Sequence, residues 1–172
     1  MVLMPASSTP TPDPARAEGP RNRSFDPGAV VDGAGQLGDG TNADRSIPVT
    51  VQNLTGAISV STGTDHTCAL LSAGTVKCWG YNSRGQLGDG TTTTRFSPVT
   101  VLYLSQVTAI EIGDDHTCAI AAAGSVMCWG SNFFGALGDG STTNRTRAVQ
   151  VQGAGRGDRD RRRHLPLGRG AS

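Results

Sequence analysis

The chain contains a 15-residue stretch, residues 66–80, that recurs 50 residues later at 116–130. A Gly-x-Leu-Gly-Asp-Gly run follows each copy, at 85–90 and 135–140, and a third copy of this run lies at 35–40. Similarity at a fixed period marks a repeat protein, in which each unit buries its apolar face against the next one. The period therefore limits the chain to folds that are built from stacked, similar units.

Each copy of the stretch has the pattern of a β-hairpin. Residues 67–71 and 75–79 are short runs of β-branched, apolar and aromatic residues, and Ser-Ala-Gly separates them, which is a strand, turn and strand signal. Gly74 can adopt the left-handed backbone that closes a three-residue loop. The resulting register places Cys68 directly opposite Cys78.

The two cysteine pairs are predicted to form disulfides. In the second copy the loop at 122–124 places Cys118 opposite Cys128 by the same count. Directly opposed strand residues have β-carbons about 4.5–5.5 Å apart, so that a disulfide needs only a modest local adjustment. Two alternatives stay open: the cysteines are reduced and fill the core, or a pair and the neighbouring His66 hold zinc. A structural zinc site normally has four ligands, and the cysteine spacing is longer than that of a zinc knuckle.

Four short strand candidates occur in each period. In the first period they are residues 49–51, 57–61, 66–71 and 75–79, and residues 99–130 repeat the set. Apolar alternation and Gly-containing turns between short strands favour propeller blades over a helical solenoid. We therefore predict an all-β fold, a partial β-propeller of about two to two and a half four-stranded blades.

The ends of the chain differ from the repeats. Residues 1–28 are rich in Pro, Ser and Thr and are expected to form a disordered leader. Residues 29–54 form an incomplete repeat, because the Cys-Trp-Gly-x-Asn segment expected before the first Gly-rich run is missing. Residues 49–153 hold two propeller-type repeats and the start of a third, and residues 154–172 form a basic tail.

The tail departs abruptly from the 50-residue register. Residues 156–163 are Arg-Gly-Asp-Arg-Asp-Arg-Arg-Arg, where an echo of residues 107–110 is expected. One GC-rich coding of this segment, read one nucleotide later, translates as Ala-Val-Thr-Ala-Ile-Ala-Ala-Gly, with the displaced valine in register. The tail is therefore either an out-of-frame translation of another repeat or a genuine basic segment that contacts phosphates or an acidic surface.

Several residues recur at the repeat period and are assigned structural roles. The aspartate of each Gly-rich run is expected to cap backbone amides in an Asx-type turn; calcium binding, the alternative, would need further acidic ligands that do not follow. The arginine six residues further on is expected to brace a neighbouring loop. The histidines are expected to hydrogen-bond backbone groups rather than act in catalysis. The framework residues are His66, His116, Trp79, Trp129, Leu87, Leu137, Asp89 and Asp139.

Charge and hydropathy narrow the functions further. The formal net charge is +1, but residues 35–153 carry six basic and eight acidic groups, and the last 19 residues carry six arginines against two aspartates. The repeats thus give no electrostatic case for nucleic-acid binding, and only the tail is a candidate for it. No stretch of 18 apolar residues that could span a membrane occurs.

The cysteine pairs indicate an extracytoplasmic or secreted protein, since disulfides persist mostly outside the cytoplasm. The start of the chain has neither a basic region nor a long apolar core, so that no secretory signal is visible in it. Either the true start lies upstream or the cysteines are reduced, and we favour an upstream start.

The motif Gly-x-x-His-Thr-Cys-Ala-Leu, followed by Gly-Thr-Val-Lys-Cys-Trp-Gly-x-Asn-x-x-Gly-Gln-Leu-Gly-Asp-Gly-Thr, resembles the regulator of chromosome condensation repeat over residues 35–153. The resemblance implies a seven-bladed β-propeller with about 50 residues per blade, usually a platform for other proteins. The cysteine pair resembles that of bacterial extracytoplasmic members. Because such a ring needs about 350 residues, the chain is expected to be a fragment, a truncated product or an assembly subunit that self-associates through open blade edges.

Three functions follow from the residues and the resemblance. The leading prediction is a non-catalytic module without a cofactor, which binds an unknown protein through loops at the blade tops. Its candidate contacts are Tyr81, Arg84, Phe133 and Phe134. The second is guanine-nucleotide exchange on a small GTPase, because some eukaryotic members act on Ran and bind chromatin. The third is a propeller hydrolase or lyase. Another similar bacterial propeller is a secreted inhibitor of β-lactamases.

Overall fold

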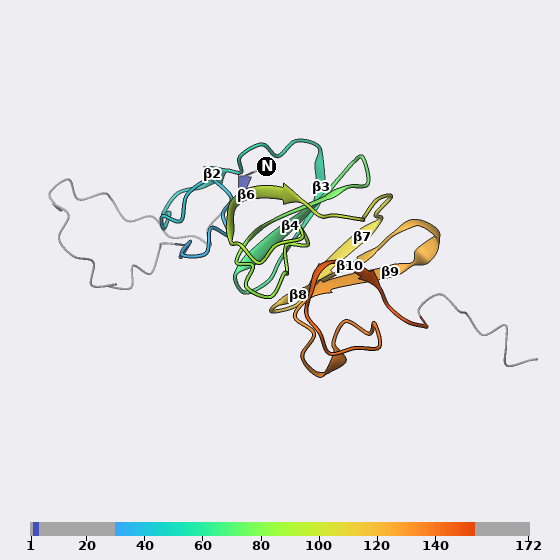
Figure 1. The fold of residues 1–172 in the computed structure, drawn as a ribbon. Helices are drawn as coiled ribbons and strands as arrows, with labels where there is room; N and C mark the ends of the chain where they lie inside the picture. The colour runs from blue at the N-terminus through green and yellow to red at the C-terminus, as the bar shows by residue number, and fades with distance from the viewer. Residues whose placement is uncertain (1, 4–29, 154–172) are drawn as a thin grey trace, which may run out of the picture.

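The computed structural model describes residues 2–3 and 30–153, and the predictions for the leader and the basic tail lie outside these residues. The described chain forms two four-stranded antiparallel sheets, which lie side by side in Figure 1. The first sheet, blade 1, has the order β3-β4-β5-β6. Its strands are β3 (Ala57–Thr62), β4 (His66–Leu71), β5 (Val76–Gly80) and β6 (Arg95–Thr100).

The second sheet, blade 2, repeats this arrangement. Its strands pair in the order β7-β8-β9-β10. They are β7 (Ala109–Ile112), β8 (His116–Ile120), β9 (Val126–Gly130) and β10 (Arg145–Gln150), with single 3-10 turns η1 (Ala122–Gly124) and η2 (Phe133–Gly135) before and after β9. The prediction of an all-β fold with four-stranded units is confirmed.

The hairpin register is also confirmed. Strands β4 and β5 pair with Cys68 opposite Cys78, and β8 and β9 pair with Cys118 opposite Cys128. Gly74 closes the first hairpin with a φ of 73°, in the left-handed region where glycine has no steric cost. The turn residues therefore set the register as expected.

The strands are grouped into sheets differently from the prediction. Residues 49–51 were expected to open the first four-stranded unit, but β2 (Val49–Thr50) pairs with β1 (Val2–Leu3) instead. The fourth strand of blade 1 is β6, whose Val99 pairs with Cys78 of β5. A periodic sequence can be divided at any point of its period, so that periodicity alone does not say which strand closes which sheet.

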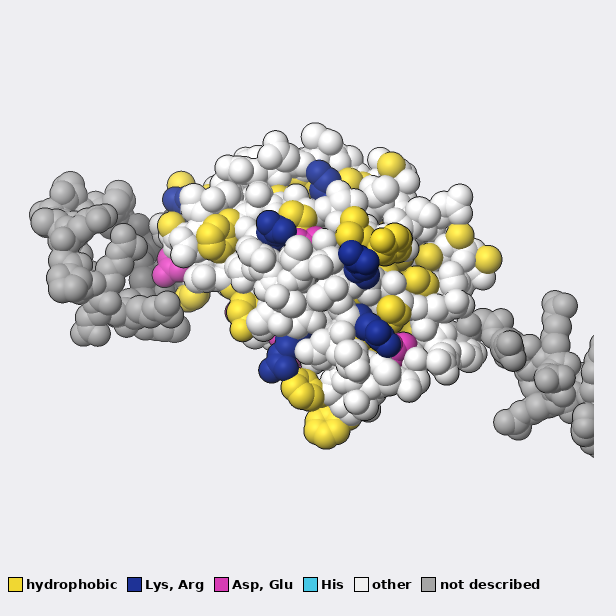
Figure 2. Space-filling model, viewed as in Figure 1, with side chains coloured by type: hydrophobic (Ala, Val, Ile, Leu, Met, Phe, Trp, Pro, Cys, Tyr) yellow, Lys and Arg dark blue, Asp and Glu magenta, His cyan; other side chains and the backbone are white. Residues whose placement is uncertain are grey.

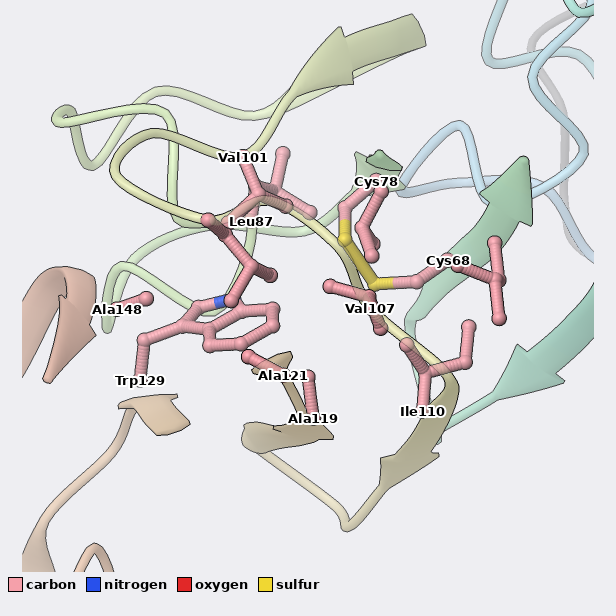
Figure 3. Close-up of a cluster of buried hydrophobic side chains, with 13 residues drawn as sticks. Cys68, Cys78, Leu87, Val101, Val107, Ile110, Ala119, Ala121, Trp129 and Ala148 are labelled. Atoms are coloured by element: carbon pink, nitrogen blue, oxygen red, sulfur yellow. A yellow bond between two sulfur atoms is a disulfide. The ribbon is translucent and has the colours of Figure 1, made fainter. Parts of the chain in front are cut away.

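The main apolar core lies between the two blades. The face of blade 1 that carries Leu70, Val76 and the disulfide shares one buried cluster with Ile110 and Trp129 of blade 2. Figure 3 shows Ile110 near the Cys68–Cys78 disulfide. Burying a Leu or Ile side chain contributes roughly 1.5–3 kcal/mol, so this face stabilises the stacking of the blades. The opposite face of blade 1 carries Ala69 and Trp79, and Val51 and Leu54 of the incomplete repeat cover it.

Candidate interaction surface

The Gly-rich run of each repeat is held by an aspartate-centred turn. Asp89 Oδ1 accepts hydrogen bonds from the Thr91 backbone N–H at 2.9 Å and from the Thr91 hydroxyl at 2.7 Å. Its other oxygen accepts a hydrogen bond from the Arg95 Nε at 2.9 Å. Burial raises the pKa of Asp89, but the hydrogen bonds from Thr91 and Arg95 outweigh burial and hold the pKa below its ordinary value. The predicted Asx-type turn is present.

The recurring arginines differ from their expected role. We expected them to brace neighbouring loops, but each one pairs with the aspartate of its own Gly-rich run. The three pairs are Arg45 with Asp39, Arg95 with Asp89, and Arg145 with Asp139. An arginine six residues after the aspartate reaches back across the same turn, which closes the loop on itself.

An asparagine joins the aspartate turn to the rest of the loop. Asn82 Oδ1 accepts the Leu87 backbone N–H at 3.0 Å, and Asn82 Nδ2 donates to Asp89 Oδ1 at 3.2 Å and to the Thr93 carbonyl at 3.0 Å. Asn132 makes the same set of hydrogen bonds in the next repeat. Because the asparagine side chain uses both its donor and its acceptor, it fixes the loop that carries the exposed residues.

The tryptophan of each blade is bonded to the Gly-rich run of the preceding repeat. The Trp129 indole N–H donates to the Gln86 carbonyl at 2.9 Å, and the Trp79 indole donates to the Gln36 carbonyl at 2.8 Å. A Cβ on Gly88 would lie 2.9 Å from the Trp129 Nε1, so glycine gives the indole its space. These contacts run from one repeat to the next, which aligns the blades.

His66 also bonds to the next blade, through a side chain rather than through the expected backbone group. Its Nε2 lies 3.0 Å from the hydroxyl of Thr117. That hydroxyl has one hydrogen, which it donates to the Gln86 carbonyl, so His66 Nε2 must be the donor. Burial, together with His116, lowers the pKa of His66 to about 4, and the ring is therefore neutral at neutral pH.

The two cysteine pairs lie at disulfide distance, with Cα–Cα separations of 4.0 Å for Cys68 and Cys78 and 4.1 Å for Cys118 and Cys128. The first pair is fully buried between the blades. The second pair is on the face of blade 2 that points away from blade 1, where Cys118 is half-buried. In residues 2–3 and 30–153, no group of three or more His, Cys, Asp or Glu side chains is arranged to hold a metal.

The loops that follow β5 and β9 place three of the four candidate contact residues at the surface. Tyr81 is 39% exposed, Phe133 is 55% exposed and Phe134 is fully exposed. The Arg84 guanidinium carbon lies 4.6 Å from the centroid of the Phe133 ring, a cation–π contact between adjacent repeats. Figure 2 shows hydrophobic side chains beside a basic one at the lower tip of the molecule. We call Arg84, Phe133 and Phe134 the loop patch.

The backbone of the loop patch is strained. Phe134 has a φ of 60°, a left-handed conformation that is unfavourable for a bulky side chain. Holding a residue there costs about 1–3 kcal/mol, and such outliers cluster at functional sites. The fully exposed ring makes no buried contact that would offset this cost.

Sequence reasoning missed a second aromatic and basic pair. Tyr103 is 73% exposed with a φ of 59°, and the Arg147 guanidinium carbon lies 5.3 Å from its ring centroid. The sequence did contain a signal for Tyr103. The equivalent positions of the other repeats hold Asn53 and Gly153, residue types that tolerate a left-handed backbone, and an aromatic residue at such a position is unusual. Tyr103 therefore provides an exposed aromatic residue outside the loop patch.

Among the residues that the structure describes, none forms a helix with the length and apolar character needed to cross a bilayer.

The sequence matches family models over most of the repeats. Residues 32–70 and 73–120 match the regulator of chromosome condensation (RCC1) repeat, and residues 57–86 and 107–136 match a second model with the same description. Among curated proteins, none matches this sequence.

Several solved structures share the fold. Human WBSCR16 is 23% identical with a TM-score of 0.60, and the match covers 69% of this chain and 32% of that protein. Prp20p from Saccharomyces cerevisiae, whose structure is described with its binding to Gsp1p and histones, is 17% identical with a TM-score of 0.63, over 72% of this chain and 33% of that one. Yeast RCC1 (Prp20) bound to Kap60 is 24% identical with a TM-score of 0.53, over 62% and 25% of the two chains. At these identities the likeness shows the fold, a partial β-propeller, and the chain spans about a third of their length or less.

Proposed function

Because the chain belongs to the regulator of chromosome condensation repeat family, we propose that it is a non-catalytic module that binds another protein through the loop patch. The residues that recur between repeats hold the framework in place: Asn82 fixes its own loop, and His66 and Trp129 hydrogen-bond to the neighbouring repeat. The side chains of Arg84 and Phe133 contact each other at the surface, and the Phe134 ring is fully exposed. They are therefore available for recognition.

One observation carries this proposal, the strained and fully exposed Phe134 beside the stacked pair of Arg84 and Phe133. Aromatic and arginine side chains dominate the binding energy of protein interfaces. Exposed phenylalanine in a loop costs solubility, and a left-handed backbone costs folding free energy. Both costs are offset when a protein partner covers the rings.

The proposal also covers the cellular location of the module and the larger assembly to which it belongs. The two cysteine pairs support an extracytoplasmic location, where disulfides persist. The half-exposed outer face of blade 2, where Ile120 is 44% exposed, supports a piece of a larger propeller or a subunit of an assembly. Prp20p, the yeast RCC1, is described with Gsp1p, histones and Kap60 as binding partners, so that at least one protein of this fold has protein partners.

A quantitative capture experiment tests the loop patch. The immobilised chain is exposed to an extract of the cells that produce it, and the bound protein is compared between the wild type, Phe134→Ala and Phe133→Ala. Loss of a hot-spot side chain costs about 2 kcal/mol or more of binding free energy, which corresponds to an affinity loss of about 30-fold. We therefore expect both variants to capture much less partner than the wild type.

Tyr103→Ala is the matched control, because it removes an exposed aromatic residue with a similar left-handed backbone from another loop. We expect this control to capture as much partner as the wild type. Equal capture by the wild type and both phenylalanine variants would contradict the proposal, as would a wild type that captures nothing above a blank support.

A further inference from the structure

Asp32 occupies the position in the incomplete repeat that Asn82 and Asn132 occupy in the two complete ones, at a spacing of 50 residues. All three lie five residues before the leucine of the Gly-rich run, and all three accept the backbone N–H of that leucine. The distances are 2.9 Å from Leu37 to Asp32, 3.0 Å from Leu87 to Asn82, and 2.9 Å from Leu137 to Asn132. The substitution therefore changes one atom of the side chain, the amide nitrogen, into a carboxyl oxygen.

The surroundings of that atom accept hydrogen bonds rather than donate them. In the complete repeats the amide nitrogen donates to the Asp oxygen of the turn and to backbone carbonyls, for example from Asn132 to Asp139 Oδ1 at 3.1 Å and to the Thr143 carbonyl at 3.0 Å. The incomplete repeat builds the same turn, since Thr41 donates to Asp39 Oδ1 at 2.9 Å through its backbone and at 2.7 Å through its hydroxyl. An oxygen in the amide position thus faces acceptors.

The structure shows the consequence at Asp32. Its side chain is fully buried, and its Oδ2 has no hydrogen-bond partner among the described residues. Among the residues that the structure describes, the charged groups that face it are the carboxylates of Asp39 and Asp44 and the guanidinium of Arg45. Because Arg45 is already paired with Asp39, the site holds more negative charge than positive charge. A buried carboxylate without a donor is costly, and a proton on Oδ2 removes the cost by restoring a donor.

We propose that Asp32 is a protonated carboxylic acid that latches the first Gly-rich turn onto blade 1, and that its ionisation releases this turn. The acid hydrogen takes the place of an asparagine amide hydrogen, and on release it passes to water. Burial raises the pKa of Asp32 to about 6, and the Leu37 hydrogen bond opposes that rise. The latch therefore weakens as the pH rises towards about 6.

The latched turn covers the face of blade 1 that carries the tryptophan. The carbonyl of Gln36, between Asp32 and Leu37 in the turn, accepts the Trp79 indole N–H at 2.8 Å and the Thr67 hydroxyl at 2.9 Å. Trp79 is fully buried in the wild type. Release of the turn removes the acceptor of the Trp79 indole N–H and of the Thr67 hydroxyl, so that pH controls how firmly the incomplete repeat is held on this blade face.

The sign of the effect follows from the direction of the pKa shift. In the open turn Asp32 has the ordinary pKa of about 3.9, whereas in the closed turn its pKa is higher. As the pH rises from about 4 through 6, the open form ionises first and gains population. A shift of about two pKa units lowers the ratio of closed to open turn by up to about 100-fold.

Hydrogen exchange of single backbone amides in the full chain tests this inference. The Leu37 amide reports on the latch, and the Leu87 and Leu137 amides, which are bonded to Asn82 and Asn132, are internal controls. After correction for intrinsic exchange, we expect Leu37 protection to fall by up to about 100-fold between pH 4 and 8 relative to the two controls. Asp32→Asn copies the complete repeats and is expected to abolish this relative fall.

Three results would overturn the latch. Leu37 protection that follows the controls at every pH would show that Asp32 does not titrate in this range. An unchanged fall in Asp32→Asn would assign the titration to another group. A fall that disappears when calcium is added to the wild type would make the site a cation site rather than a proton latch. The comparison within the wild type needs no variant, so the test stands even if the variant folds poorly.

Discussion

The indole Nε1 of Trp129 donates a hydrogen bond to the carbonyl oxygen of Gln86 at 2.9 Å, although the two residues belong to different blades. Gly88, two residues after Gln86, leaves the space that the indole ring occupies. The contact joins the Gly-rich run that follows β5 of blade 1 to strand β9 of blade 2. A substitution that disturbs this contact therefore measures how much of the unfolding free energy comes from the stacking of the blades rather than from a single sheet.

Gly88→Ala is predicted to be strongly destabilising. The new Cβ would lie 2.8 Å from Val101 Cγ1 and 2.9 Å from the Trp129 Nε1, at a φ of 68°. Gly138→Ala is the matched control, since its φ is 62° and its Cβ would come no closer than 3.0 Å to Val151. Both variants carry a backbone cost of about 1–2 kcal/mol, and the clash adds about 1–3 kcal/mol to Gly88→Ala alone. Urea unfolding measures both, and equal losses would contradict the packing.

Leu70→Ala and Ile120→Ala are predicted to differ although they occupy the same position of β4 and β8. Leu70 is 2% exposed between the blades, whereas Ile120 is 44% exposed on the outer face of blade 2. The first variant should lose about 2–5 kcal/mol of unfolding free energy, and the second about 1 kcal/mol or less. Chemical denaturation at low protein concentration checks this. A large loss at Ile120 would mean that another surface covers this face in solution.

His66 is predicted to destabilise the fold as the pH falls. Its folded-state pKa of about 4 lies below the unfolded value of about 6.5, so that between these values the unfolded chain binds a proton that the folded chain does not. The loss reaches about 2–3 kcal/mol near pH 4.5, and none is expected above about pH 7. Asp32 has the opposite effect on the unfolding free energy over the same pH range, because its pKa is raised in the folded state. The measurement is therefore made in chains that carry Asp32→Asn.

The measurement compares the unfolding free energies of Asp32→Asn and of Asp32→Asn with His66→Gln at pH 4.5 and 7.5. Glutamine can still donate to the Thr117 hydroxyl but does not titrate. We expect the unfolding free energy to change less between pH 4.5 and pH 7.5 in the chain that also carries His66→Gln. An identical difference in both variants would show that the buried histidine is not the group responsible.

The two disulfides are predicted to respond differently to a reductant. Cys68 and Cys78 are fully buried between the blades, whereas Cys118 is half-buried on the outer face of blade 2. Thiol exchange requires access of the attacking thiolate to sulfur. Under native conditions dithiothreitol should therefore open the Cys118–Cys128 bond first, which alkylation and peptide mass spectrometry would detect. Simultaneous reduction of both bonds would imply that the blades separate readily.

Local pairing could be predicted because it depends on neighbours in sequence. Ser-Ala-Gly closes the first hairpin, and its length alone sets Cys68 opposite Cys78. The aspartate turn was also accessible, since Asp89 and Thr91 are two residues apart. Arg95 was expected to brace a neighbouring loop, whereas it pairs with Asp89 of its own loop. The spacing did not decide this, because a repeated arginine can reach its own loop or the next one.

The sequence by itself determined the repeat unit, the hairpin register and the cysteine pairing, because turn length and strand alternation act within one unit. Only the tertiary structure decided which strand closes each sheet, which of two equivalent side chains is buried, and which buried group is left without a donor. Leu70 and Ile120 have the same local pattern but differ in exposure. The physical reason is that burial and desolvation depend on the blade that stacks on a given face, and similar repeats within one chain do not have the same neighbours.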